Sequence, residues 1–449
     1  MKTKPHFPVT NRKSEEIISV YRGENIEVGQ FITEAKALAS TLPAHRYVFN
    51  LFANRYEYLL GFCASILAGQ TTLMPPNRLD HTLEELAQQY PDSYKLGACG
   101  LPYPEIRKGV FRGKPGQFQD DDIPLISADQ LCAIAFTSGS TGAPRPNPKY
   151  WHTLRSGSFA NIGLLLKNTG KPLHVIATVP PQHMWGLETS ILFPLLSKVT
   201  ISDLTPFYPR DIADAIDSMP APRALVSSPI HLRTLLKSGV SFAGLDHIFS
   251  ATAPLSAELA SSLEKNFDTR VYEVFGCTES GIIAGRYTTE ETYWNLAEIF
   301  ELDVRETGAL VRAEHLPGDV EIHDVIEKID ERSFKWHGRH QDMVNIAGKR
   351  GSLTGLNRRL LAIPEVIDGV IFSPGDDSER LVAIVVAPKL KPAEVVDALK
   401  VTVDSVFLPR QVFMVSALPR QETGKLASSA IRQLYADILK EKKRQQGTA

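Results

Sequence analysis

Apolar residues recur along the amino-terminal half of the chain with two different spacings. Where they stand three and four positions apart, the pattern is that of an amphipathic helix, and short apolar runs are typical of strands. Helices are predicted at residues 28–42, 56–68, 188–196, 209–218 and 231–238. Strands are predicted at residues 46–52, 71–74, 174–179, 198–201 and 224–226. Strands that alternate with helices of this length indicate right-handed βαβ units and a mainly parallel sheet.

The pattern changes near residue 340. Strand-like runs at 370–372 and 381–387 stand beside helix-like runs at 393–401 and 427–440. This combination fits a small α+β domain. We therefore expect an α/β protein whose large amino-terminal domain of βαβ-type sheets, residues 1–338, is joined by a hinge to a small mobile domain, residues 339–449.

Composition narrows the class of protein. The chain has 449 residues, of which 43% are hydrophobic and 22% are charged, close to the average of globular proteins. These values exclude a disordered chain and a coiled coil. The formal net charge of −2 gives no electrostatic reason to expect a nucleic acid or an anionic membrane as partner.

The four cysteines, Cys63, Cys99, Cys132 and Cys277, stand far apart and form no Cys-x-x-Cys pair. A disulfide framework or a zinc site is therefore not expected, and reduced thiols fit a cytoplasmic protein better. The longest apolar run, residues 59–69, is well short of the ~20 residues needed to span a bilayer. The amino end shows no signal-peptide pattern, so we expect a cytoplasmic protein without a membrane span.

The strongest local signal is a loop of small hydroxyl and glycine residues that follows an apolar stretch, residues 131–136, expected to be a buried strand. The loop residues are Thr137, Ser138, Gly139, Ser140, Thr141 and Gly142. Such a loop can place backbone N–H groups and hydroxyls around a polyphosphate, since no bulky side chain prevents close approach. The spacing is not that of the GxxxxGK[ST] phosphate loop, and the chain has no GxSxG nucleophile elbow. Taken alone, the same residues would also fit a plain turn.

Four further motifs follow this loop in the chain. They are residues 250–255 (SATAPL), residues 274–279 (VFGCTE), Asp324 with Gly338-Arg339 fourteen positions later, and residues 419–425 (PRQETGK). Together the five resemble the ordered signatures of the adenylate-forming (AMP-binding) superfamily, which comprises acyl-CoA synthetases, luciferases and the adenylation domains of peptide synthetases. The resemblance spans residues 137–425 and is that of a short bacterial member.

The resemblance implies an enzyme that joins a carboxylate to the α-phosphate of ATP and releases pyrophosphate, with Mg²⁺ as cofactor. Lys425 is then the catalytic lysine, which neutralises charge on the carboxylate and phosphate oxygens in the transition state. Glu279 would be a hard oxygen ligand of Mg²⁺, and Thr278 would donate its hydroxyl to the α-phosphate. Outside this order of motifs, a lone Lys, Glu or Asp is ordinarily a solvated surface residue.

Other positions of the motifs imply contacts with the nucleotide. Phe275 can stack on the adenine, and Asp324 can accept hydrogen bonds from both ribose hydroxyls. The remaining nucleotide-binding positions are Thr252, Ala253, Pro254, Gly276 and Arg339. Trp336 and His337 are expected to be packing residues of a β-turn rather than functional ones.

The acid pocket is expected around His183, Ala251 and Val274. His183 stands where relatives carry an aromatic residue or a histidine near the carboxylate, although a histidine packed beside Trp185 would also fit. Relatives that hold long acyl chains often have glycine at the positions of Ala251 and Val274, so these side chains should shorten or narrow the pocket. A compact acid, aromatic in type, is therefore expected, with a medium- or long-chain fatty acid as the alternative.

The sequence departs from the superfamily at several positions. Arg145 stands where relatives usually have a lysine, and the next lysine is Lys149, so either side chain could contact the phosphates. Gln341, the expected hinge, stands where relatives have Asp or Lys. Asn345 stands where many have a lysine tied to the thioester step. The acyl acceptor is therefore open between the pantetheine of CoA and that of an acyl carrier protein.

Two further alternatives concern partners and activity. Carrier proteins are acidic, and the basic residues within 440–444 would offer them a docking face, although such a run is usually only a solvated helix end. From another class of function, the chain could be a degenerate nucleotide-binding protein without turnover. The joint presence of the site residues speaks against this reading, because a non-catalytic binder needs no lysine such as Lys425 on a mobile domain.

Overall fold

The computed structural model describes residues 5–97, 118–138, 144–167, 172–339, 342–346, 349–374, 380–421 and 424–446. Two compact units make up the chain: Met1–Glu301 with Arg312–Val320, and Leu302–Val311 with Glu321–Ala449. Each unit has its own hydrophobic core. Among the helices of the described residues, none has the length and apolar character needed to cross a membrane.

The first unit alternates strands and helices, as the sequence predicts. It begins with β1 (His6–Pro8), β2 (Ile17–Tyr21), β3 (Glu24–Glu27), α1 (Val28–Thr41), β4 (Tyr47–Asn50), α2 (Arg55–Leu67), β5 (Thr71–Met74), α3 (Asp80–Gln89), β6 (Ser93–Leu96), the 3₁₀ turn η1 (Asp120–Asp122), β7 (Leu125–Ser127), β8 (Leu131–Ser138) and β9 (Pro144–Tyr150). It continues with α5 (Trp151–Leu166), β10 (His174–Ala177), α6 (Met184–Leu187), the π-helical turn η2 (Glu188–Leu192), α7 (Phe193–Leu196), β11 (Thr200–Ser202), α8 (Pro209–Asp217), β12 (Arg223–Ser227), α9 (Pro229–Ser238), β13 (His247–Ser250), α10 (Ala257–Phe267), β14 (Arg270–Cys277), β15 (Gly281–Tyr287) and β16 (Trp294–Leu296).

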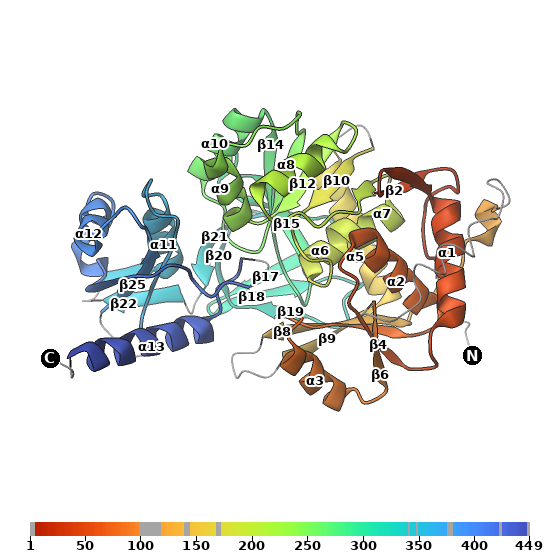
Figure 1. The fold of residues 1–449 in the computed structure, drawn as a ribbon, viewed down its shortest axis with the longest axis horizontal. Coiled ribbons are helices and arrows are strands. Elements are labelled where there is room, and N and C mark those ends of the chain that lie inside the picture. Colours follow the sequence, from red (N-terminus) through yellow and green to blue (C-terminus); the bar gives the residue numbers. More distant parts are fainter. Residues whose placement is uncertain are drawn as a thin grey trace. The chain divides into compact units, whose positions relative to one another are not determined.

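The largest sheet of this unit has the strand order β16-β15-β14-β13-β12-β10-β11-β2-β3. Its central strands β10, β12, β13 and β14 run parallel. Successive side chains of a strand point to opposite faces, so Leu225 packs with α8, α9 and α10 while its neighbour Val226 belongs to the core cluster on the other face (Figure 1). The sheet is therefore covered by apolar side chains on both faces, which is the condition for a parallel sheet.

A second sheet of the first unit has the order β6-β4-β5-β8-β9. Strands β4, β5, β6 and β8 are parallel, and β9 returns antiparallel beside β8 with Thr137 opposite Arg145. Both sheets thus have the predicted parallel strands in their centres. An antiparallel strand follows these parallel strands in each sheet, β15 beside β14 in the large sheet and β9 beside β8 in the second. Of the predicted phosphate loop, Gly139, Ser140, Thr141 and Gly142 lie outside the described residues.

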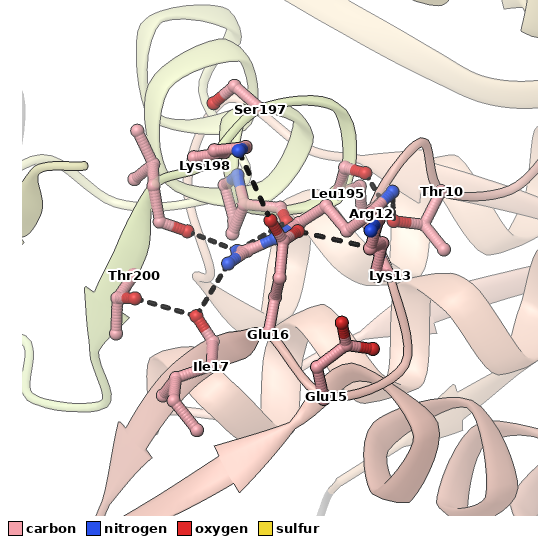
Figure 2. Close-up of polar contacts among 12 residues, drawn as sticks. Thr10, Arg12, Lys13, Glu15, Glu16, Ile17, Leu195, Ser197, Lys198 and Thr200 are labelled. Carbon is pink, nitrogen blue, oxygen red and sulfur yellow. Dashed lines mark hydrogen bonds and ion pairs between the residues drawn. The ribbon is translucent and has the colours of Figure 1, made fainter. Parts of the chain in front are cut away.

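A buried arginine helps to hold the amino-terminal segment against the rest of the first unit. Arg12 donates through Nη1 to the carbonyl of Val199 at 2.6 Å and through Nη2 to that of Ile17 at 2.8 Å. The bond between Arg12 and Ile17 can be followed in Figure 2. The Arg12 Nε lies 3.2 Å from Glu16, which also lies 3.7 Å from Lys198. Because these partners come from β2 and from the loop before β11, Arg12 joins segments that are far apart in the sequence.

The remaining elements form a smaller α+β unit. They are β17 (Glu301–Arg305), β18 (Gly308–Arg312), β19 (Val320–Ile322), β20 (Asp324–Lys328), β21 (Ser333–Arg339), β22 (Met343–Ile346), β23 (Lys349–Ser352), α11 (Leu353–Leu361), β24 (Asp368–Phe372), β25 (Val382–Val386), α12 (Pro392–Lys400), the 3₁₀ turn η4 (Ser405–Phe407), β26 (Gln411–Met414) and α13 (Ser428–Gln446). The sheet β24-β25-β26 packs α11 and α12 against Val385 on one face and α13 against Ile384 on the other. The hinge at Gln341 lies outside the described residues and stays a prediction, as does the boundary at 338 and 339.

Candidate active site

The carboxyl ends of β12, β13 and β14 form one edge of the large sheet. Ser227 pairs with Ser250, and Ser250 pairs with Glu273, so residues 274–277 extend beyond the ends of β12 and β13 and pair only with β15. Ala251 and Val274 lie at this edge and are 8% and 7% exposed. The structure therefore brings together two of the motifs that the sequence singles out, at the edge where α/β folds bind ligands.

The turn after β13 contains the three residues expected beside the adenine. Thr252 is half-buried and has φ +78°, a conformation that a β-branched residue rarely adopts, while Ala253 and Pro254 are exposed. Such a backbone persists only where its surroundings enforce it, and it is common in ligand-binding segments.

A buried carboxylate on β14 holds this turn through a hydrogen bond to its backbone. Glu273, 2% exposed, accepts a hydrogen bond from the Leu255 N–H at 2.7 Å. Its other oxygen accepts from Arg286 Nη2 at 2.8 Å and from the Thr288 hydroxyl at 3.2 Å. Sequence reasoning missed both β14 and Glu273, although a carboxylate between the apolar neighbours Tyr272 and Val274 is itself a signal, since a buried charge needs partners.

The turn between β14 and β15 carries the Thr-Glu pair. Thr278 is half-buried and Glu279 is exposed, so both side chains can reach a ligand. Phe275 is half-buried, with its ring centroid 5.5 Å from that of Trp294. A Cβ atom on Gly276 would lie 2.2 Å from the carbonyl oxygen of Gly281, so the hairpin requires glycine at position 276.

Lys149 lies under this turn. Its Nζ donates to the carbonyl oxygens of Thr278 at 2.5 Å and Glu279 at 3.0 Å, and the residue is 3% exposed. Burial lowers the pKa of Lys149. Because its ammonium is bound to the protein backbone, Lys149 supports the turn. Arg145 is exposed, and which of the two cations contacts the phosphates stays a prediction.

Glu188, the first residue of η2, lies on the other side of the same turn. Its Oε1 accepts from Asn161 Nδ2 at 2.8 Å and from the Ile282 N–H at 3.2 Å. Burial raises the pKa of Glu188 to about 7, against the opposing effect of the Lys149 charge. Sequence reasoning predicted a helix from residue 188 but did not find this role, because the partners of Glu188 are distant in the chain.

His183 precedes α6 and is half-buried. Its backbone N–H donates to the Pro180 carbonyl at 3.2 Å. The side-chain Nε1–H of Trp185 donates to the Ser227 carbonyl at 3.2 Å. His183 is therefore close in sequence to a tryptophan bound at the same sheet edge. Its expected role toward the carboxylate stays a prediction.

A second histidine at this edge was missed by sequence reasoning. His231 Nδ1 lies 2.9 Å from the Thr178 hydroxyl, which lies 2.8 Å from the Ser227 hydroxyl. Burial lowers the pKa of His231, which favours the neutral imidazole.

Cys277, in the Thr-Glu motif, is not set up as a nucleophile. Burial raises the pKa of its thiol, and its Sγ lies 3.2 Å from the Ser280 hydroxyl. A thiol held in this protonated form is a poor nucleophile.

In the second unit, Asp324 and Arg339 are opposite each other in the β20-β21 hairpin. The Trp336 Nε1–H donates to Asp324 Oδ1 at 2.7 Å. The predicted β-turn for Trp336 and His337 is wrong, because both lie within β21, where cross-strand pairing holds them extended. Trp336 therefore orients the carboxylate expected to bind the ribose.

The loop that carries Lys425 is a closed turn. The Gln421 N–H donates to the Lys425 carbonyl and the Gly424 N–H to the Gln421 carbonyl, both at 2.8 Å. Arg420 donates to both oxygens of Asp368 at 2.6 Å and to the Gly424 carbonyl at 2.8 Å. The buried Asp368 thus anchors the loop, and the Lys425 side chain is exposed.

Metal binding would depend on the substrate as well as on the protein. Within the described parts of the chain, no group of three or more His, Cys, Asp and Glu side chains could hold a metal ion. Mg²⁺ in nucleotide sites is ordinarily held by one or two carboxylates together with phosphate oxygens and water. The single exposed carboxylate of Glu279 fits that mode of binding.

Comparisons with known proteins agree with these motifs. Residues 101–301 match the family model of AMP-binding enzymes. A 4-coumarate–CoA ligase from Halorhodospira halophila is 29% identical over 301 residues, which cover 65% of this chain and 73% of that protein. The putative long chain fatty acid-CoA ligase VraA from Staphylococcus haemolyticus is 23% identical over 385 residues, 79% of this chain and 80% of the other.

Solved structures share the fold. ATP-bound MatB from Rhodopseudomonas palustris has a TM-score of 0.78 at 18% identity, over 95% of this chain and 97% of that chain. The O-succinylbenzoate coenzyme A synthetase MenE from Bacillus subtilis, in complex with AMP, has a TM-score of 0.76 at 15% identity, over 94% and 97%. The predicted α/β fold is thus confirmed. The chain belongs to the adenylate-forming superfamily of AMP-binding enzymes and is an acid–thiol ligase of that superfamily.

Proposed function

We propose that the protein activates a compact, aromatic carboxylic acid with ATP and transfers the acyl group to a pantetheine thiol. One observation carries this proposal. The turn after β13 and the Thr278–Glu279 turn after β14 leave adjacent parallel strands at the same sheet edge, where a nucleotide and an acid can meet.

The residues suit the first half-reaction. A carboxylate oxygen of the acid attacks the α-phosphorus of ATP, and the bond from that phosphorus to the bridging oxygen of pyrophosphate breaks. The Thr278 hydroxyl would donate to an α-phosphate oxygen and Glu279 would bind Mg²⁺, which when bound neutralises phosphate charge. Lys425, at the end of its closed turn, would stabilise the negative charge that develops during bond exchange.

The size of the acid is inferred from two buried side chains. Ala251, directly after β13, and Val274, on the adjacent β14, present a methyl and an isopropyl group at the sheet edge, which narrows the space next to that edge. The relative named 4-coumarate–CoA ligase and the structural neighbour named anthranilate CoA ligase AuaEII, at 15% identity and a TM-score of 0.75, act by name on aromatic acids. The relative VraA, named for long-chain fatty acids, supplies the competing substrate class.

We propose CoA as the first acceptor to test, since the relatives named above as ligases use it by name. An acyl carrier protein is the second candidate. The observation that favours it is the exposed basic end of α13, with Lys440, Lys442 and Arg444. An acidic carrier would find complementary charge there.

The test is ATP–pyrophosphate exchange across a panel of hydroxybenzoates, cinnamates and fatty acids of graded length. Exchange is expected with aromatic acids, and Lys425→Ala should lower its rate by orders of magnitude with little change in ATP affinity. Thioester formation is then followed by mass, with CoA and with a phosphopantetheinylated carrier protein. Exchange with fatty acids alone would reject the aromatic class, and exchange at the wild-type rate in Lys425→Ala would reject the role of Lys425.

A further inference from the structure

A buried lysine and a buried glutamate lie behind the Thr278–Glu279 turn, and none of the steps above uses them. Lys149 on β9 and Glu188 in η2 are 3% and 4% exposed. Burying a charged side chain is unfavourable unless it is paired or hydrogen-bonded. Two backbone carbonyls of a surface turn could instead be hydrated by water, so folding alone does not require a lysine beneath them.

The two side chains bind the turn at its two ends, the ammonium to carbonyl acceptors and the carboxylate to an N–H donor. On the side that enters the turn, the Lys149 ammonium binds the carbonyls of Thr278 and Glu279. On the side that leaves it, the Glu188 carboxylate binds the N–H of Ile282. A cation thus meets acceptors and an anion meets a donor within one hairpin turn, and the charges of Lys149 and Glu188 also favour each other.

The surroundings leave the turn little freedom to move. Gly281 has φ +74°, and a Cβ atom there would lie 2.5 Å from Glu188 Oε1, so backbone and carboxylate are in close contact. Asn161 on α5 donates to the same oxygen at 2.8 Å. The supports therefore come from three different elements, β9, α5 and η2, and all of them belong to the first unit.

We propose that Lys149 and Glu188 are positioning residues for adenylation, which hold the backbone of residues 278–282 so that Thr278 and Glu279 are aligned before ATP and Mg²⁺ bind. The inference rests on the proposed function, because it takes these two side chains as the ones that contact phosphate and metal. Neither positioning residue touches the substrate in this account.

The experiment measures ATP–pyrophosphate exchange as a function of Mg²⁺, ATP and acid concentration in Lys149→Met. The substitution leaves an unbranched side chain that is one heavy atom shorter and removes both hydrogen bonds. Loss of alignment at the reacting centre costs about 10²-fold in rate. We expect a fall of that order in the maximal rate, a higher Mg²⁺ concentration for half-maximal exchange, and an unchanged KM for the acid.

Two further variants separate positioning from general stability. Lys149→Arg can still donate to both carbonyls and should restore most of the Mg²⁺ dependence. Lys198→Met is the matched control, because Lys198 is an exposed lysine of the same unit whose ammonium lies 3.7 Å from Glu16 (Figure 2). It should leave rate and Mg²⁺ dependence unchanged. A purely structural role would lower the unfolding temperature of Lys149→Met without altering the Mg²⁺ titration of the folded enzyme.

The outcomes distinguish this inference from the proposed function. If the wild type exchanges pyrophosphate and folded Lys149→Met gives the same rate and Mg²⁺ titration, the inference is wrong and the function stands. If the wild type exchanges with no acid, the function fails, and Mg²⁺-dependent ATP binding measured by calorimetry still decides whether Lys149→Met weakens the site. Should Lys149→Met fail to fold, Glu188→Met replaces it, because it removes the acceptor of the Ile282 N–H. Loss of a hydrogen bond to a charged group is worth roughly tenfold, so an unshifted Mg²⁺ titration in that variant overturns the inference.

Discussion

Glu188 should make the stability of this protein depend on pH in a direction opposite to that of ordinary carboxylates. Burial raises its pKa from 4.5 to about 7, so between these values the folded protein binds more protons than the unfolded chain. Stability from this group is fully present below pH 4.5 and is lost as the pH rises through 7. The free energy of unfolding should fall by roughly 2.5 kcal/mol between pH 5 and pH 8 through this group alone.

Few ionisable groups near Glu188 change their charge between pH 5 and pH 8. Lys149 is the cation that acts on it, and Lys149 in turn interacts with Cys277, Glu279 and His315. Burial raises the pKa of the Cys277 thiol and lowers that of His315 to about 4, so both are mainly neutral from pH 5 to 8. Within this cluster, the expected fall in the free energy of unfolding between pH 5 and pH 8 therefore comes from Glu188.

The assay is chemical unfolding of the wild type and of Glu188→Gln at pH 5, 6, 7 and 8. Glutamine does not titrate, so the stability difference between the two proteins should change by roughly 2.5 kcal/mol over this range. Glu15→Gln is the control, because Glu15 is exposed (Figure 2) and its carboxylate is solvated in both states. Parallel curves for wild type and Glu188→Gln would refute the reasoning and would mean that Lys149 keeps Glu188 ionised throughout.

Three further outcomes follow from contacts within the two units. Trp336→Phe removes the 2.7 Å hydrogen bond to Asp324 and should raise the KM for ATP about tenfold, as seen in ATP titrations of pyrophosphate exchange; an unchanged KM would separate Asp324 from the ribose. Asp368→Asn weakens the two bonds from Arg420 and should slow single-turnover adenylate formation about tenfold, whereas Asp397→Asn, at an exposed position of α12, should not. Val274→Gly should admit bulkier acids at a loss of roughly 1–3 kcal/mol for the native acid, and an acid profile identical to the wild type would place Val274 outside the pocket.

The order of elements was predictable from the sequence because side-chain periodicity reports burial along each element. The strand predicted at 71–74 is β5, and the helix predicted at 209–218 is α8, which ends one residue earlier. The helix expected from residue 188 instead begins at Met184 and passes through the π-helical turn η2. Nothing in a 3.6-residue period marks such a turn, because it depends on what packs against the helix.

The ordered motifs were also readable in the sequence, since glycine and small hydroxyl residues at a tight turn report a local backbone requirement. Gly276 is one example: a Cβ atom there would lie 2.2 Å from a carbonyl oxygen only five residues away. Such local constraints identified the superfamily and the residues expected to touch ATP.

Only the tertiary structure decided what supports those residues. Lys149 binds carbonyls 129 and 130 positions later in the chain, and Glu188 binds an N–H 94 positions later. Taken in sequence alone, Lys149 was a candidate phosphate ligand and Trp336 a packing residue. No local pattern records a hydrogen bond between residues so far apart, because the partners meet only when the strands that carry them pair and pack. The amino-acid sequence by itself therefore determined the order of helices and strands and the residues expected to contact ATP. The packing of distant elements determined which polar side chains support those residues.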